Sequence, residues 1–199
     1  QTCALPIYRW MEHTSLAELG RAADKHPLDL MLDLALDEDL RTVFVATTLN
    51  SDESAVGRLL VDENSLVSLS DAGAHLTFFC DAGFGLHVLG HWVRERKLMP
   101  MEAAIRKLTS VPADLFGMRD RGRLAPGAWA DLLLFDPATV GRGGKERVFD
   151  LPGGAPRLTT PALGLCGVWV NGVQVADESG ILEQSGRPGR LLRRFGESC

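Results

Sequence analysis

Apolar positions recur with a helical period through most of the first 120 residues. Ser15 and Glu18 have the spacing of a capping box, which predicts a helix that begins after Thr14 or Ser15. Pro27 suits the first turn of a second helix, whose predicted apolar face comprises Leu28, Met31, Leu32, Ala35 and Leu36. Similar patterns predict helices over residues 51–61, 84–96 and 100–108, and a short one from Ser110 that Gly117 ends.

Two short runs are instead apolar and β-branched, which is typical of strands buried on both faces of a parallel sheet. These runs are residues 42–47 and 66–70. We expect them to be adjacent parallel strands, joined by the helix between them, because a right-handed crossover is strongly favoured. Two strands cannot form a stable parallel sheet, and an eight-stranded barrel takes about 250 residues. The chain is therefore expected to be a piece of a larger α/β protein and to be poorly stable by itself.

The pattern changes after residue 122. Residues 168–170 and 173–175 alternate around Asn171-Gly172, which predicts a type I′ hairpin because both turn residues must adopt positive φ. We expect residues 132–135 to share a small antiparallel or mixed sheet with this hairpin. Residues 141–161 are rich in Gly, Pro and charge and are predicted to form a long loop.

Composition and charge narrow the possible functions. The net charge of −5 argues against a nucleic-acid partner, and the basic segment 186–194 is interpreted as a solvated end. No apolar run reaches the roughly 20 residues of a membrane helix, so no membrane partner is expected. The four cysteines lack any paired spacing, which favours a reducing compartment such as the cytoplasm and offers no cysteine-built zinc site. Residues 1–7 match neither a helix nor a strand, so a foreign origin for them stays open.

One acidic residue stands where α/β proteins place their chemistry. Asp71 directly follows the second predicted strand and has small neighbours. Ligands and catalytic groups gather at the carboxyl ends of parallel strands. Asp71 is therefore a candidate metal ligand or general base, with a purely structural turn residue as the alternative.

Several motifs together are characteristic. Residues 70–75 read Ser-Asp-Ala-Gly-Ala-His, and residues 122–132 read Gly-Arg-Leu-Ala-Pro-Gly-Ala-Trp-Ala-Asp-Leu. With segments 85–95 and 101–110, they resemble the end of the barrel in the D-aminoacylase-like branch of the amidohydrolase superfamily. The resemblance covers residues 68–194 and, more weakly, 15–64. The Gly-x-Leu-x-Pro-Gly-x-x-Ala-Asp-Leu stretch is specific to the superfamily, and Ser-Asp-x-Gly narrows the branch.

The resemblance implies a fold and a chemistry. Residues 1–121 would be the last strand–helix units of a (β/α)8 barrel, and residues 122–199 part of a small β-sandwich domain. Asp71 would end the eighth strand and contact a divalent metal, usually zinc. It would also take and return the proton of a metal-activated water. His75 would line the substrate pocket or hydrogen-bond to the intermediate, with a structural role as its alternative.

One departure concerns the metal. The family's other ligands, including a His-x-His pair, should precede Asp71, yet the upstream histidines are His13 and His26, and neither follows a buried strand. One carboxylate does not bind zinc, so the other ligands are expected outside this chain. His87 and His91 have a spacing that can bind zinc, but no glutamate follows His87. We interpret the pair as a solvated or loop-packed helix face.

The sequence thus predicts a hydrolase of C–N bonds other than peptide bonds, present as an inactive fragment. Its small-molecule substrates would be N-acyl-D-amino acids, with Asp71 as general base and acid. Two alternatives stay open, namely a cyclic-amide hydrolase resembling dihydroorotase or hydantoinase, and a non-catalytic binding module. The sequence does not decide the oligomeric state or the acyl group.

Overall fold

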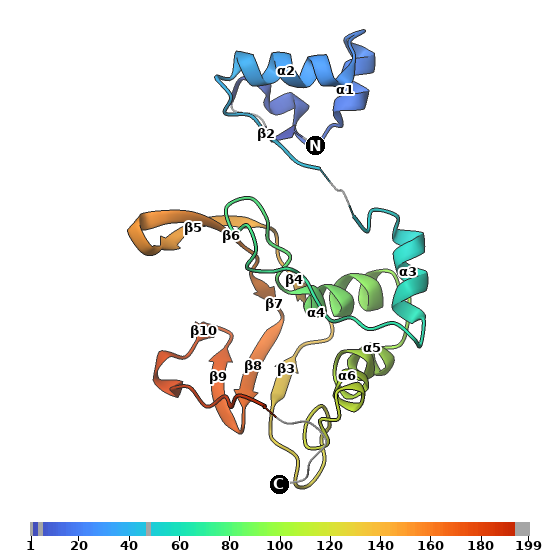
Figure 1. Ribbon diagram of the computed structural model, residues 1–199, viewed down its shortest axis with the longest axis vertical. Coiled ribbons are helices and arrows are strands. Elements are labelled where there is room, and N and C mark those ends of the chain that lie inside the picture. Colours follow the sequence, from blue (N-terminus) through green and yellow to red (C-terminus); the bar gives the residue numbers. More distant parts are fainter. Residues whose placement is uncertain (1, 4–5, 47–48, 194–199) are drawn as a thin grey trace. The chain divides into compact units, whose positions relative to one another are not determined.

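The computed structural model describes residues 2–3, 6–46 and 49–193, and the chain forms two compact units, Gln1–Val56 and Gly57–Cys199 (Figure 1). The β-rich part after residue 122 lies in the second unit, together with helices that precede it. This division differs in position from the expected domain boundary at residues 121–122, which stays a prediction. Within the described residues, no helix is both long and apolar enough to span a bilayer.

Two helices build the small core of the first unit. In α1 (Leu16–Ala22), the Ser15 hydroxyl accepts a hydrogen bond from the Glu18 amide, and the Glu18 carboxylate accepts one from the Ser15 amide. The predicted capping box is thus confirmed. In α2 (Pro27–Asp37), Leu30 and Leu34 are buried with Leu19 of α1.

The predicted apolar face of α2 is wrong. Leu28, Leu32 and Leu36 are 51%, 50% and 69% exposed, whereas Leu30 and Leu34 lie in the core. The helix carries leucines on both sides, so its periodicity alone could not decide which side faces the core. The position of α1 decides it.

The two predicted barrel strands do not form a parallel pair. β2 covers only Val43–Phe44 and pairs antiparallel with β1 (Thr2–Cys3), while residues 65–70 form no strand. Residue 47, the last of the first predicted run, lies outside the described residues. A parallel strand buried on both faces needs neighbours at both edges, and within the described residues the first run has only the antiparallel neighbour β1 and the second run has no strand neighbour. The expectation that residues 1–7 match neither a helix nor a strand is wrong for the described ones, because Thr2–Cys3 form β1 and η1 (Pro6–Met11) begins at Pro6.

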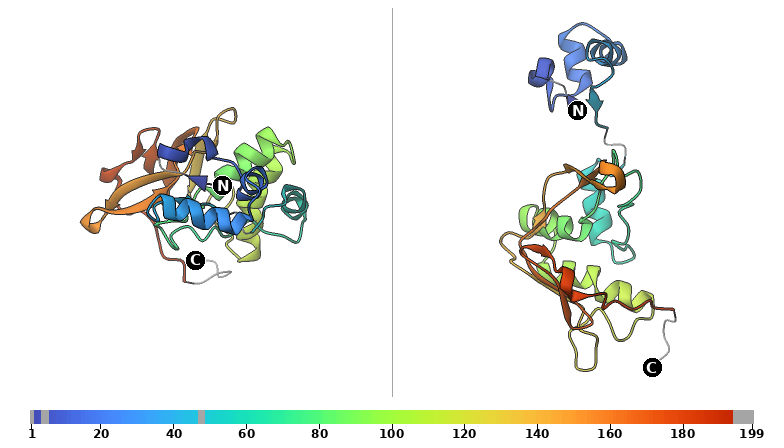
Figure 2. Two further views of the ribbon diagram at one scale, coloured as in Figure 1. Left: turned by 90° about the horizontal axis from the view of Figure 1, so that it is seen from above. Right: turned by 90° about the vertical axis from the view of Figure 1, so that its left-hand side faces the viewer.

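The helices from residue 53 onward form where the sequence predicted them. α3 (Glu53–Val61) begins next to Asp52, whose carboxylate, rather than the Ser51 side chain, accepts from the amides of Ser54 and Ala55. α4 (Phe84–His87) continues into the π-helix η2 (Val88–Glu95), followed by α5 (Met101–Leu108) and α6 (Ser110–Leu115). Figures 1 and 2 show these helices on one side of the second unit and the larger sheet on the other.

One close backbone contact joins η2 to the β-rich part. A Cβ on Gly90 would lie 2.8 Å from the Val140 carbonyl oxygen and 3.0 Å from the Gly141 Cα, so this position tolerates only glycine without a shift. Val140 is completely buried, and the Arg94 guanidinium donates a hydrogen bond to its carbonyl. The helix and the start of β4 (Gly141–Arg142) are thereby fixed against each other.

The larger sheet confirms the predicted pairing. β3 (Leu132–Phe135), β8 (Leu165–Val170), β9 (Val173–Asp177) and β10 (Gly180–Ile181) are antiparallel, in the order β10-β9-β8-β3. Asn171 and Gly172 have φ of 48° and 82°, as a type I′ turn requires.

The segment predicted to be a long loop, residues 141–161, is largely strand. β4 pairs with β7 (Ala162–Leu163), and β5 (Glu146–Leu151) pairs with β6 (Ala155–Thr159) in a hairpin. Most residues of β5 are exposed, so its apolar and polar residues do not alternate as they would in a strand with one buried face. Instead, Arg157 donates hydrogen bonds of 2.6 and 2.7 Å to the Asp150 carboxylate across the hairpin.

The Gly-x-Leu-x-Pro-Gly-x-x-Ala-Asp-Leu stretch of residues 122–132 is attached to the turn of the β8–β9 hairpin. Arg121 donates hydrogen bonds to Asp131 and, at 3.0 Å, to the Asn171 side chain, while Asp131 accepts from the Asn171 amide at 2.8 Å. Arg121 and Arg190 lie over the Trp129 ring, 5.6 and 4.3 Å from its centroid. The basic segment 186–194 is therefore more than a solvated end, since Arg190 packs on this cluster.

Replacing Gly172 with alanine is expected to destabilise the β8–β9 hairpin by about 1 kcal/mol, because a Cβ strains a residue held at positive φ. The added Cβ would meet only Ala130, at 3.9 Å, so the cost is conformational. The midpoint of urea unfolding, followed by tryptophan fluorescence, measures this loss of stability. Gly144→Ala is the control, since nothing lies within 4 Å of that Cβ. Equal midpoints for the two variants would contradict the turn assignment.

Candidate functional site

Asp71 and His75 lie in one exposed loop of the second unit, between α3 and α4. Alternate residues of this loop have positive φ, namely Asp71 (51°), Gly73 (101°) and His75 (51°). Non-glycine residues seldom adopt this conformation, and where they do they are often found at functional sites. The Ser-Asp-Ala-Gly-Ala-His motif thus forms a tightly wound loop, not the end of a β-strand as predicted.

The first half of the loop is held by its own short hydrogen bonds. The Ala72 amide donates to the Ser70 hydroxyl at 3.1 Å, and the Ala74 amide donates to the Asp71 carbonyl at 3.0 Å. The His75 ring stacks on Phe78, with centroids 5.1 Å apart. The structure therefore places both predicted site residues in one loop, but no hydrogen bond joins their side chains among the described residues.

The second half of the loop is attached to the β5–β6 hairpin. The Leu158 amide donates a 2.8 Å hydrogen bond to the Leu76 carbonyl, and the Arg147 guanidinium donates one of 3.1 Å to the Thr77 carbonyl. The sequence did not reveal Arg147 and Leu158 as contacts of the loop, because residues 141–161 were predicted to form a loop themselves. No local pattern reveals such a contact, since the partners lie about 70 or more residues apart.

Residues that flank the hairpin hold the end of the same loop. Asp81 lies 3.5 Å from the Arg142 guanidinium and 3.3 Å from the Lys145 ammonium. The Thr160 hydroxyl donates to the Ala82 carbonyl at 3.2 Å. The loop is thus tied to the β-rich part at several points between residues 76 and 82.

His87 and His91 form a stacked pair on the helix that follows the loop. Their ring centroids are 4.9 Å apart with planes 8° from parallel, and His91 Nδ1 lies 3.0 Å from the Glu95 carboxylate. Burial lowers the pKa of His87, and the positive Arg142 lowers it further. The hydrogen bond from His91 lowers the pKa of Glu95. Both rings are half-buried, so this helix face is packed rather than fully solvated.

The residues present do not form a metal site by themselves. Nowhere in the described ranges do three or more His, Cys, Asp or Glu side chains converge in a way that could hold an ion. Zinc sites in proteins normally take at least three protein ligands, and Asp71 supplies one carboxylate. A zinc ion does not fit the described residues alone.

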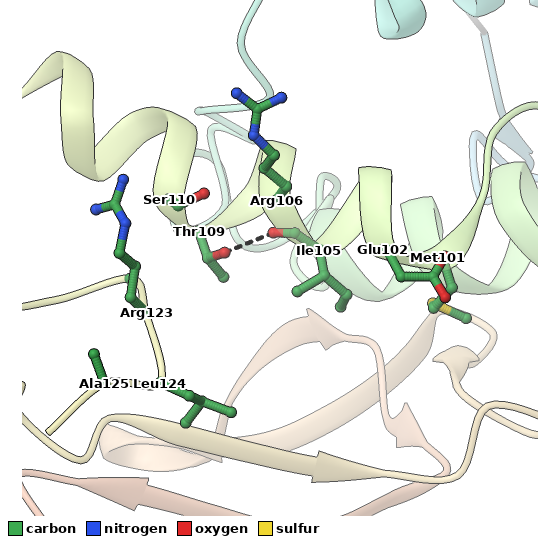
Figure 3. Close-up of a pocket in the computed structure, with 10 residues that line it drawn as sticks. Met101, Glu102, Ile105, Arg106, Thr109, Ser110, Arg123, Leu124 and Ala125 are labelled. Carbon is green, nitrogen blue, oxygen red and sulfur yellow. Dashed lines mark hydrogen bonds between the residues drawn. The ribbon is translucent and has the colours of Figure 1, made fainter.

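A shallow hollow of about 600 Å³ lies elsewhere, between α5 and residues 122–125 (Figure 3). Ile105 and Leu124 line it, and the Thr109 hydroxyl on its wall donates to the Ile105 carbonyl at 2.7 Å. Neither Asp71 nor His75 is among its lining residues. The hollow therefore does not serve the predicted chemistry.

Comparisons with known proteins identify relatives of this chain. The model of the Amidohydrolase family matches residues 8–176. An N-acyl-D-glutamate deacylase from Alcaligenes xylosoxydans xylosoxydans is 40% identical over 147 residues, which are 72% of this chain and 27% of that protein. The chain thus spans about a quarter of the length of this relative.

Two solved structures of D-aminoacylase are similar in fold. One, described as defining a novel subset of amidohydrolases, has 26% identity and a TM-score of 0.51, and covers 92% of this chain and 36% of its own. The other is a mutant in complex with copper chloride, with 25% identity, a TM-score of 0.50, and coverage of 90% and 34%. The predicted resemblance is confirmed, and because the family model extends over most of the residues, this chain belongs to the amidohydrolase family.

Proposed function

We propose that this chain carries part of a hydrolase that cleaves the C–N amide bond of N-acyl-D-amino acids. The observation that carries the proposal is the 40% identity to an N-acyl-D-glutamate deacylase over 147 residues. The two D-aminoacylases of similar fold agree with the same substrate class. The substrate is accordingly a small molecule.

Asp71 is the general base and acid of this reaction. Its carboxylate is exposed, and within the described residues it makes no hydrogen bond or ion pair that would occupy it. A carboxylate in this state can accept a proton from the water that attacks the amide carbonyl, and can return it to the leaving nitrogen. His75, four residues further along the same loop, lines the substrate pocket.

The complete enzyme uses a divalent metal, with zinc as the first choice. Support comes from the D-aminoacylase solved with copper chloride, since nitrogen and oxygen sites that bind copper also bind zinc. Because the described residues hold no metal site, most ligands come from segments outside this chain, and Asp71 is at most one of them.

Asp71→Asn in the complete enzyme is expected to lower kcat by about 10²–10⁴-fold, the usual contribution of a general base. Asparagine keeps the size and tolerates the positive φ, but it cannot accept the proton. KM is expected to change little, because the loss falls mainly on the transition state. Steady-state kinetics with N-acetyl-D-glutamate and a hydantoin, with metal content measured in parallel, test this and distinguish a deacylase from a cyclic-amide hydrolase.

Asp24→Asn is the matched control, because Asp24 is also exposed and has the same φ of 51°. It should leave kcat unchanged, as should His87→Ala and His91→Ala within a few-fold. Near-normal turnover in Asp71→Asn, with loss of metal in either histidine variant, would move the chemistry to the stacked histidines. Absence of turnover on every amide tested, with no metal bound, would favour a binding module.

Residues 1–199 alone are expected to be inactive and weakly stable. Large apolar side chains are left uncovered, with Leu36, Leu49 and Leu69 being 69%, 80% and 79% exposed, and the described residues lack a metal site. Thermal melting and zinc-dependent deacylation of the purified chain test this. A cooperative transition accompanied by turnover would show that the chain is a self-sufficient enzyme.

A further inference from the structure

One cross-strand residue pair of the β5–β6 hairpin donates hydrogen bonds to two consecutive carbonyls of the loop that carries Asp71. Arg147 and Leu158 are cross-strand partners in the hairpin. The Leu158 amide donates a hydrogen bond of 2.8 Å to the Leu76 carbonyl, and the Arg147 guanidinium donates one of 3.1 Å to the Thr77 carbonyl. The loop is therefore attached to β6 by a backbone hydrogen bond and to β5 by the Arg147 side chain.

Further contacts extend this attachment to the end of the loop. Asp81 pairs with Arg142 and Lys145, which precede β5, and the Lys145 ammonium lies 5.7 Å from the centroid of the Phe79 ring. Thr160, directly after β6, donates to the Ala82 carbonyl. Residues on both sides of the hairpin thus hold the loop, so Arg147 is one of several side chains that contact it.

The attached half begins immediately after the site residues. Leu76 follows His75 directly, and Asp71 lies five positions earlier. Among the described residues, short turns hold the chain between them, such as the bond from the Ala74 amide to the Asp71 carbonyl. Because this segment is short and wound, the position of the Asp71 backbone depends on where the residues that follow it are attached.

We propose that the β5–β6 hairpin is a positioning element for the Asp71 loop and that Arg147 is its positioning residue. This inference rests on the proposed function, since it assigns Arg147 to the same reaction. Arg147 acts through the Thr77 carbonyl and touches neither substrate nor metal. The same hairpin carries a second arginine for comparison, since Arg157 and Asp150 pair across its strands at 2.6 and 2.7 Å.

The kinetic test compares two arginines of one hairpin in the complete enzyme. Arg147→Met removes the bond to the loop and is expected to lower kcat about 10-fold while KM changes by less than about 3-fold, since a small misplacement of a catalytic group chiefly affects the reacting step. Arg147→Lys keeps a charged donor and should recover part of kcat. Arg157→Met, the matched control, breaks the pair with Asp150 but leaves the bond from Arg147 to the Thr77 carbonyl in place, and it should leave kcat near the wild-type value.

The second measurement does not depend on activity. Hydrogen exchange of the amides of Ala74, Phe78, Phe79 and Leu158 is expected to become roughly 5-fold faster in Arg147→Met than in Arg157→Met, because local opening of the loop costs less free energy. Unchanged exchange in the β8–β9 hairpin shows that the variants remain folded.

The outcomes separate the two proposals. Faster loop exchange together with a lower kcat and recovery by lysine supports positioning by Arg147. Unchanged loop exchange overturns it, and so does faster exchange with an unchanged kcat. Normal turnover in Asp71→Asn would instead contradict the proposed function. That result is independent of the hydrogen-exchange rates, so the two failures can be told apart.

Discussion

The close approach of η2 to the backbone at Val140 fixes the second unit. Gly90 admits the Val140 carbonyl at a distance that any side chain would obstruct, and Arg94 satisfies that buried carbonyl by donating a hydrogen bond. β4 begins at the next residue, and the β5–β6 hairpin follows it. The hairpin that holds the Asp71 loop therefore takes its position from the same helix that follows the loop. A buried carbonyl without a donor would cost about 1–3 kcal/mol, so Arg94 and Gly90 act together.

The superfamily-specific stretch has a physical explanation in this structure. Asp131 accepts from both Arg121 and the backbone of Asn171, so one carboxylate joins the chain before β3 to the turn between β8 and β9. A turn with two residues at positive φ is restrictive, and fixing it sets the register of the whole hairpin. The motif thus stabilises the sheet by attaching the segment before β3 to the β8–β9 turn, and its presence does not identify the substrate.

The sequence predicted the local features and missed those that depend on distant partners. The capping box at Ser15 and the Asn171-Gly172 turn need only their own neighbours, and both were correct. The side of α2 that faces the core depends on α1, and Val43 and Phe44 pair with β1, which lies about 40 residues earlier in the chain. The β5–β6 hairpin escaped detection because a largely exposed two-stranded ribbon needs no apolar alternation.

The candidate site divides in the same way. The Ser-Asp-Ala-Gly-Ala-His motif gave Asp71 and His75 as candidates, because motif residues can be recognised one by one, and their roles stay predictions. Their alternating positive φ could not be predicted, and neither could the bond from Arg147, since the free edge of β6 exists only once the hairpin has formed.

The elements that we propose to position the Asp71 loop all belong to the second unit. The wound loop, the hairpin, η2 and the Val140 contact lie within this unit. A metal site, by contrast, needs ligands that the described residues do not bring together. Attachment of the Asp71 loop and assembly of a metal site are therefore separate physical problems. The contacts of the hairpin and of η2 bear on the attachment of the loop, whereas a metal site depends on groups beyond those that the described residues bring together.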